Sequence, residues 1–214
     1  MTSGRRGERQ TAYQILVASS LKLLGQEKGD LWDSGKVETN QSSQVEYAGQ
    51  PLVSREDCFW KVRLWDGEGR AGGWSAAERW QIGLLKPGDW SAQWIRAGTP
   101  ATAAIPYLRK SFDLKWPIKR AVLYTTALGL YEAHINGQRV GDHILAPDWT
   151  DYRERVRYQA YDVSALLKRG HNAMGTLLAN GWFSGHIGNG GYQFFGNVLW
   201  HSMLNRWPGC GFPC

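Results

Sequence analysis

The chain has 214 residues, which suits one large domain or two small ones and allows one or two sheet-packed cores to be buried. Hydrophobic residues make up 43% of it, yet no run of about 18 apolar residues occurs, which argues against a transmembrane helix. The net charge of +6 is spread among acidic residues without a basic stripe, which argues against a nucleic-acid-binding protein.

The first half of the chain consists of short strand-like runs separated by turns. Between residues 11 and 18, Tyr13, Ile15 and Val17 alternate with the residues of the opposite face, as in a half-buried strand. Further strands are expected over residues 36–39, 58–65 and 80–84, with a turn at 66–69. Strands at this regular spacing are typical of a β-sandwich.

A Leu-Lys-Pro-Gly-Asp segment interrupts the strand pattern at residues 85–89. Pro and Gly together mark a break, and the strand pattern restarts after Trp94. We therefore expect a domain junction near residue 88, with one domain over residues 1–88 and a second over 89–214.

The second half continues the β pattern. Strands are expected over residues 121–126 and 130–140, where Asn136-Gly137 between two alternating runs is a strong signal for a hairpin, and Glu132 and His134 are expected to face solvent. One short helix is predicted over residues 163–168. Arg153, Arg155 and Arg157 alternate as on a solvated strand face. The fold class predicted is all-β.

Cysteine usage and the amino-terminal residues indicate the cellular compartment. Cys58, Cys210 and Cys214 are odd in number and lack the spacing of metal ligands, so neither a disulfide framework nor a zinc site is expected. The first residues include Arg5 and Arg6 without an apolar stretch of signal-peptide length. We expect a soluble, cytoplasmic protein without membrane partners.

Aromatic residues are numerous, with 12 Trp, 9 Tyr and 6 Phe. Flat side chains stack on the apolar faces of pyranose rings, and they also fill the cores of β-sandwiches. Trp149, Tyr152 and Trp182 stand beside turn residues, where either role gives the same sequence pattern, with core packing the favoured one.

Several strings resemble the amino-terminal part of bacterial α-L-rhamnosidases, which are glycoside hydrolases. The first set resembles a fibronectin-III-like β-sandwich and the second a jelly-roll, carbohydrate-binding domain, and together they extend from about Gln10 to Gly191. The strings are residues 10–15, 32–37, 60–66 and 74–75 in the first set, and 127–132, 135–142, 145–147, 149–152 and 181–185 in the second.

The chain also departs from this resemblance. The enzymes that it resembles have a further strand before Gln10, a longer jelly roll and an α/α barrel that holds the catalytic carboxylates, which implies an incomplete jelly roll here. After about Asn197 the resemblance stops, and the tail from about residue 198 has no pattern that we can assign. A frameshift, a truncated gene or a divergent segment would each produce such a tail.

Three carboxylates, Asp142, Asp148 and Asp151, lie close together in a loop-rich stretch. From the residues alone they suit the acid/base pair of a glycosidase or, with loop carbonyls, a calcium ion that needs six to eight oxygen ligands. The resemblance implies calcium held by Asp142 and the loop around Asn189, bridging to rhamnose. His143 stands where the resemblance leads us to expect an amide, and imidazole is a poorer calcium ligand than oxygen.

The resemblance implies a non-catalytic accessory and sugar-binding portion of an enzyme that hydrolyses terminal α-L-rhamnosyl residues. Its partners would be a rhamnosyl-containing glycan and the catalytic barrel, no cofactor beyond that calcium is required, and the chain alone is expected to be inactive. The sugar-binding residues implied are Asp142, Trp149, Asp151, Tyr152, Trp182 and Asn189. Two alternatives remain open: a purely structural buttress that binds no ligand, and a stand-alone rhamnose-binding lectin.

Overall fold

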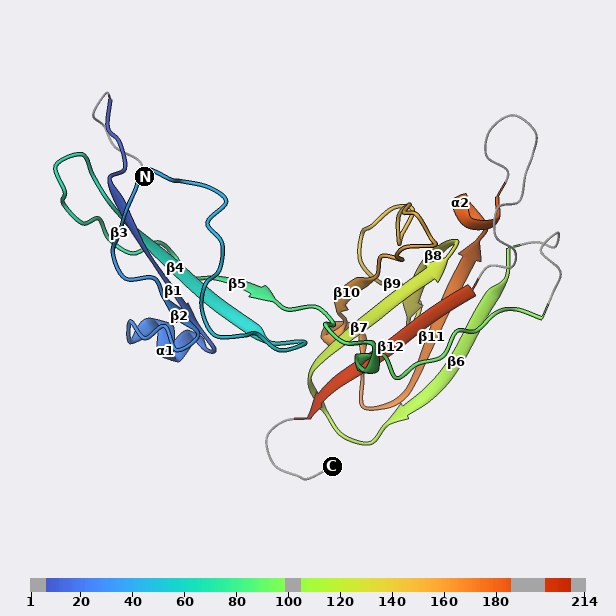
Figure 1. Cartoon of the computed structure of the whole chain (residues 1–214). Helices are drawn as coiled ribbons and strands as arrows, with labels where there is room; N and C mark the ends of the chain where they lie inside the picture. Colours follow the sequence, from blue (N-terminus) through green and yellow to red (C-terminus); the bar gives the residue numbers. More distant parts are fainter. Residues whose placement is uncertain (1–6, 99–104, 186–198, 209–214) are drawn as a thin grey trace. The chain divides into compact units, whose positions relative to one another are not determined.

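A computed structural model describes residues 7–98, 105–185 and 199–208 and divides the chain into two compact units, Met1–Trp90 and Ser91–Cys214 (Figure 1). Both are built mainly of β-strands, which confirms the all-β class. The division lies beside the segment where a junction is expected, near residue 88. Within the described ranges, no helix is long and apolar enough to span a membrane.

The first unit contains one antiparallel sheet in the order β2-β1-β4-β5, with β3 also paired to β1 (Figure 1). The strands expected over residues 11–18 and 58–65 are confirmed, and they pair with each other along the whole of β1. The elements are β1 (Ala12–Ala18), α1 (Leu21–Gly25), β2 (Trp32–Asp33), β3 (Val37–Glu38), β4 (Asp57–Trp65), β5 (Glu78–Gln81) and the 3₁₀ turn η1 (Pro87–Asp89).

One face of this sheet is closed by its own chain. Leu16 and Ala18 of β1 pack with Leu24 of α1. Trp74, in the loop between β4 and β5, packs against this cluster. Lys61 is buried, and its Nζ atom lies 4.7 Å from the centroid of the Trp74 ring in a cation–π contact.

The opposite face carries an open groove of about 640 Å³. Tyr13, Ile15 and Val17 of β1 and alternate residues of β4 form its floor, because side chains alternate between the faces of a strand. All of the lining side chains are uncharged, and several are aromatic. This face therefore offers an apolar recess lined by uncharged side chains.

We expect the groove to bind the apolar dye anilinonaphthalene sulfonate, because exposed apolar recesses take up such probes. Leu64→Gln places an amide on the groove floor and should reduce the fluorescence gain by roughly half or more. The control is Leu85→Gln, since Leu85 is exposed and lies outside the groove. Equal fluorescence from both variants would show that the dye binds elsewhere.

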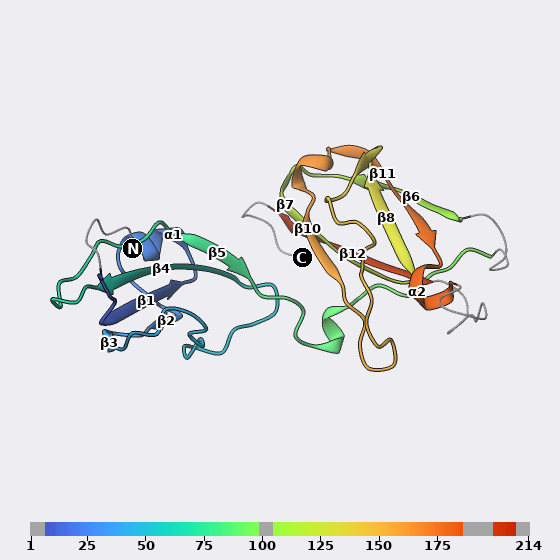
Figure 2. The ribbon, with the colours of Figure 1, turned by 90° about the horizontal axis from the view of Figure 1, so that it is seen from above.

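The second unit is a sandwich of two antiparallel sheets, β10-β7-β12 and β6-β11-β8-β9 (Figure 2). Side chains from β7, β8 and β11 form one buried cluster between the sheets, with Leu123, Ile135 and Leu178 fully buried. The elements are β6 (Tyr107–Leu114), β7 (Ile118–Leu128), β8 (Leu130–Ile135), β9 (Gln138–Arg139), β10 (Gln159–Asp162), η2 (Ser164–Leu166), β11 (Gly170–Ala179), α2 (Gly181–Ser184) and β12 (Leu199–Pro208).

Two sequence predictions for this unit were wrong, and one segment had been left unassigned. Residues 151–158 form turns and a loop before β10, so the alternating arginines lie on no strand. The helix expected over residues 163–168 is the single 3₁₀ turn η2, because the Ser164 hydroxyl donates to Asp162 instead of capping a helix. Residues 199–208, to which no pattern was assigned, form β12, which pairs with β7 along its length.

The predicted hairpin is confirmed and is held by two asparagines. Asn136 and Gly137 have φ angles of 52° and 83°, the left-handed values that a tight turn between β8 and β9 requires. Asn136 Nδ2 donates to Leu166 O and to Asn172 Oδ1, both at 2.8 Å, and its own Oδ1 accepts from Ala173 N at 3.0 Å. The side chain thus joins the hairpin to η2 and β11.

Asn172 is fully buried and makes the complementary set of contacts. Its Nδ2 donates to Lys168 O at 2.7 Å and to Gly170 O at 2.8 Å, and its Oδ1 accepts from Lys168 N at 3.0 Å besides Asn136. Every donor and acceptor position of this amide that lies within the core is satisfied, as a buried polar group requires.

Asn172→Ala should lower the free energy of unfolding by about 3 kcal/mol, because it removes four hydrogen bonds and leaves buried groups without partners. Urea unfolding followed by circular dichroism measures the change. The control is His171→Ala on the same strand, where the side chain is 68% exposed and a change below about 0.5 kcal/mol is expected. A loss below 1 kcal/mol for Asn172→Ala would contradict the structural role of the pair.

Candidate functional site

Residues 141–158, which connect β9 to β10, hold four of the six residues expected to bind sugar. The middle of this loop is fastened to the sandwich. Ala146 and Pro147 are buried, Ala146 O accepts from Tyr131 N at 2.9 Å, and Pro147 O accepts from Gln159 Nε2 at 3.1 Å. The Ala146–Pro147 peptide bond is cis.

The segment after these anchors is held by ionic and polar contacts. Asp148 Oδ2 lies 2.6 Å from Arg157 Nη1, and Asp148 Oδ1 accepts from Trp149 N at 2.7 Å. Thr150 is buried and donates through Oγ1 to Arg155 O at 2.7 Å. Between these points the Trp149 side chain is 65% exposed, so the prediction that favoured core packing for this residue was wrong.

The beginning of the loop is shaped by Gly141. Its φ is 69°, and a Cβ atom there would lie 2.2 Å from the Tyr161 ring, so no other residue fits. Tyr161 also contacts the His143 ring edge to face, with centroids 5.6 Å apart, and His143 O accepts from Arg139 Nη2 at 2.8 Å. The adjacent Asp142 side chain is fully exposed.

Burial and hydrogen bonding determine the protonation states around the loop. Burial raises the pKa of the Tyr131 hydroxyl far above its ordinary value, and that hydroxyl donates to Gln159 Oε1 at 2.7 Å. Burial also raises the pKa of Tyr161. These hydroxyls therefore stay protonated and act as hydrogen-bond partners that support the loop.

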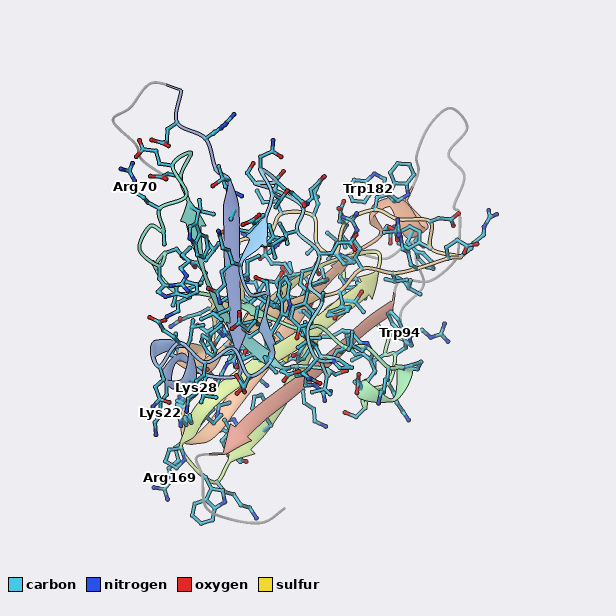
Figure 3. The ribbon with its side chains drawn as sticks, turned by 60° about the vertical axis from the view of Figure 1, so that its left-hand side comes forward. Lys22, Lys28, Arg70, Trp94, Arg169 and Trp182 are labelled. Carbon is cyan, nitrogen blue, oxygen red and sulfur yellow. The ribbon has the colours of Figure 1, made fainter. Side chains whose placement is uncertain are left out.

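Tyr152 and Trp182 lie further along the same end of the unit. The Tyr152 ring packs edge to face on Phe183 of α2, with centroids 5.3 Å apart, and burial raises the Tyr152 pKa, with a further contribution from the charge of Asp148. Trp182 is half-buried and extends from α2 (Figure 3). Tyr152 thus serves packing, as favoured from the sequence, and Trp149 is the most exposed of the three aromatics.

Of the residues expected to hold calcium, the structure describes only Asp142. Its side chain is fully exposed, and Oδ1 lies 3.8 Å from His143 Nδ1. Asn189 lies outside the described residues. Those that are described contain no group of three His, Cys, Asp or Glu side chains able to hold a metal ion. One exposed carboxylate does not fit an ion that needs six to eight oxygen ligands.

The loop carboxylates also lack the surroundings of a glycosidase acid/base pair. Asp148 is solvent-accessible and is engaged by Arg157, whereas the two carboxyl groups of a glycosidase have to face one sugar at a defined separation. Asp151 Oδ1 accepts from Arg153 N at 3.1 Å and stabilises the turn that it begins. The arrangement suits hydrogen bonding to hydroxyl groups better than proton transfer.

Sequence reasoning missed the residues that hold the loop. Gln159 and Arg157 make the decisive contacts, yet each is an ordinary polar residue in the sequence. The only signal was the position of Arg157 nine residues after Asp148, and this spacing alone does not identify an ion pair.

Two family models match the chain. One, described as the N-terminal domain of α-L-rhamnosidases, covers residues 116–201. The other, described as a Rha78A-like N-terminal immunoglobulin domain, covers residues 1–86. The first match extends into β12, beyond the point near Asn197 where the resemblance was expected to stop.

Similar proteins carry the same description. An α-L-rhamnosidase of Formosa agariphila is 40% identical over 84% of this chain, and one of Alteromonas sp. is 37% identical over 86%. The chain spans about a fifth of the length of these relatives, 20% and 21% respectively.

Solved structures agree with these matches. The α-L-rhamnosidase of Dictyoglumus thermophilum has a TM-score of 0.86 at 34% identity, with 96% of this chain and 24% of that chain covered. A Streptomyces avermitilis α-L-rhamnosidase complexed with L-rhamnose has a TM-score of 0.88 at 26% identity, with 96% and 36% covered.

Proposed function

The chain belongs to the α-L-rhamnosidase family through its two amino-terminal domains, and we propose that it is the accessory portion of an enzyme acting on terminal α-L-rhamnosyl residues. We further propose that its second domain binds such a residue. The binding element is the loop over residues 141–158. The catalytic part of the parent enzyme is the partner of both domains. Trp182 stays in this proposal as a residue at the edge of the site, and Asn189 stays in it on the resemblance alone.

The observation that carries this proposal is the exposed Trp149 ring on a fastened loop. Binding residues lie disproportionately on loops that a rigid scaffold positions, and contiguous exposed apolar surface marks ligand-binding sites. Ile144 and Leu145, which are 80% and 53% exposed, extend the apolar surface along the same loop. Rhamnose offers a methyl group and the C–H face of its ring to such a surface.

The carboxylates provide the polar half of the site. Asp142 is free to accept hydrogen bonds from sugar hydroxyls, and Asp148 keeps acceptor capacity while Arg157 fixes its position. Ionised acceptors form stronger hydrogen bonds than neutral ones, so two carboxylates beside an aromatic ring suit a neutral polyol.

Trp149→Ala should weaken the binding of L-rhamnose by about tenfold, because one aromatic contact of this kind contributes about 1 to 1.5 kcal/mol. Isothermal titration or ligand-observed NMR measures the affinity. The matched control is Trp116→Ala, since Trp116 is 73% exposed in the same unit but lies in the turn between β6 and β7. An equal loss for both variants would contradict the loop assignment, as would unchanged binding by Asp142→Ala.

Titration in calcium and in chelator separates the loop surface from a metal site. We expect the same affinity in both, because the described carboxylates do not converge on an ion. Loss of binding in chelator would instead support the calcium site that the resemblance implies. No binding in either solution would favour the alternative in which both domains are structural supports.

The chain should release no aryl group from an aryl α-L-rhamnoside at high protein concentration over many hours. Glycoside hydrolysis needs two carboxyl groups at defined separation, one of them protonated, and Asp148 is exposed and paired with Arg157. A heat-treated sample is the control. Activity that survives repurification and falls in Asp148→Asn or Asp151→Asn would revive the loop carboxylates as a catalytic pair.

A further inference from the structure

A second recess lies on the outer face of the four-stranded sheet of the second unit, away from its core. Its volume is about 520 Å³, and its lining includes Tyr107 and Arg109 of β6, Gly175 of β11, and Glu132 and His134 of β8. The residues that alternate with these, such as Ala133 and Thr176, are buried. The recess is therefore formed by a completed sheet and is separate from the sandwich interior.

The strand register places the lining in two rows. Gly175 pairs with Arg109 on one side and with His134 on the other, and the next row runs from Tyr107 through Leu177 to Glu132. Directly paired residues in an antiparallel sheet project to the same face. Since neighbouring strands are about 4.8 Å apart, Arg109 and His134 stand roughly 10 Å apart across a residue without a side chain.

Gly175 is not required by the backbone. It is not among the glycines with positive φ, the pairing is continuous through it, and an added Cβ atom would meet only Leu108 O, at an ordinary 3.5 Å. A glycine inside a strand weakens the strand, and it marks a bulge, a bend or the close approach of a ligand. The regular register excludes the bulge, and the recess above Gly175 provides the space for a ligand to approach closely.

The charges around the recess are unbalanced. Glu132 is engaged by His134 Nε2 at 3.4 Å and by Arg139 Nε at 3.3 Å. Arg109 has no hydrogen-bond or ionic partner within the described part of the chain, and Tyr107, two residues before it on the same face, is 75% exposed. Two guanidinium groups thus face one carboxylate, beside a free aromatic ring.

We propose that this recess binds an acidic saccharide residue, a pyranose that carries a carboxylate or a sulfate. The ring lies over Gly175 and stacks on Tyr107, and the anionic group pairs with the Arg109 guanidinium, which is suited to bidentate contacts with planar or tetrahedral anions. The site goes beyond the rhamnosyl-binding loop and does not depend on it. The accessory domain then recognises two different residues of a glycan, one neutral and one acidic.

The test compares D-glucuronic acid, D-glucose and inorganic sulfate as probes by NMR titration of the 214-residue chain. Glucuronic acid should bind about tenfold more tightly than glucose, because the two share a ring and differ in the group that reaches Arg109. Glucose 6-sulfate should resemble glucuronic acid. Equal binding of glucose and glucuronic acid, or sulfate binding as tightly as glucuronic acid, would overturn the proposal.

Variants locate the site. Arg109→Gln should reduce glucuronic acid binding about tenfold, to the level of glucose, and Tyr107→Ala should weaken both sugars. Gly175→Val should abolish binding by filling the recess, whereas Gly175→Ala should fold normally because its Cβ atom fits. Trp149→Ala should leave glucuronic acid binding unchanged, which separates this site from the rhamnosyl-binding loop. Full binding by Arg109→Gln and Tyr107→Ala would refute the proposal even if the valine variant did not fold.

Discussion

The amide pair Asn136–Asn172 is the contact on which the second domain depends. It joins the hairpin to a 3₁₀ turn and to strand β11, both of which lie about 30 residues or more further along the chain. The hairpin leads within a few residues into the loop that presents Trp149, and β11 supplies the glycine floor of the outer recess. One buried and one partly buried amide side chain therefore connect the elements that lead to two candidate binding surfaces.

Local features of the fold were predictable from the sequence, and long-range ones were not. The alternation in residues 11–18 and the Asn-Gly pair at 136–137 depend on neighbouring residues, so they are visible in one segment. The contact of Asn172 with Asn136 gives no local signal, because the two residues are 36 positions apart in the sequence. The arginines at 153–157 alternate by sequence but lie in a loop, since turns after Asp151 override the pattern.

The candidate site shows the same limit. Composition and resemblance indicated the stretch around Trp149, but an exposed and a buried tryptophan look alike in sequence. The exposure of Trp149 follows from its buried neighbours at positions 146, 147 and 150, which anchor the loop to the sandwich. The role of Gly175 could not be predicted from the sequence either. A glycine is informative only when the space above it is known, and that space is defined by β6 and β8.

The position of β12 in the sheet has a consequence for synthesis on the ribosome. β7 is the central strand between β10 and β12, and about 70 residues, needing several seconds at ordinary translation rates, separate its end from the start of β12. During that interval one edge of a long apolar strand is available to chaperones and to other nascent chains. The order of the strands along the chain thus leaves this edge of β7 open until β12 has been translated.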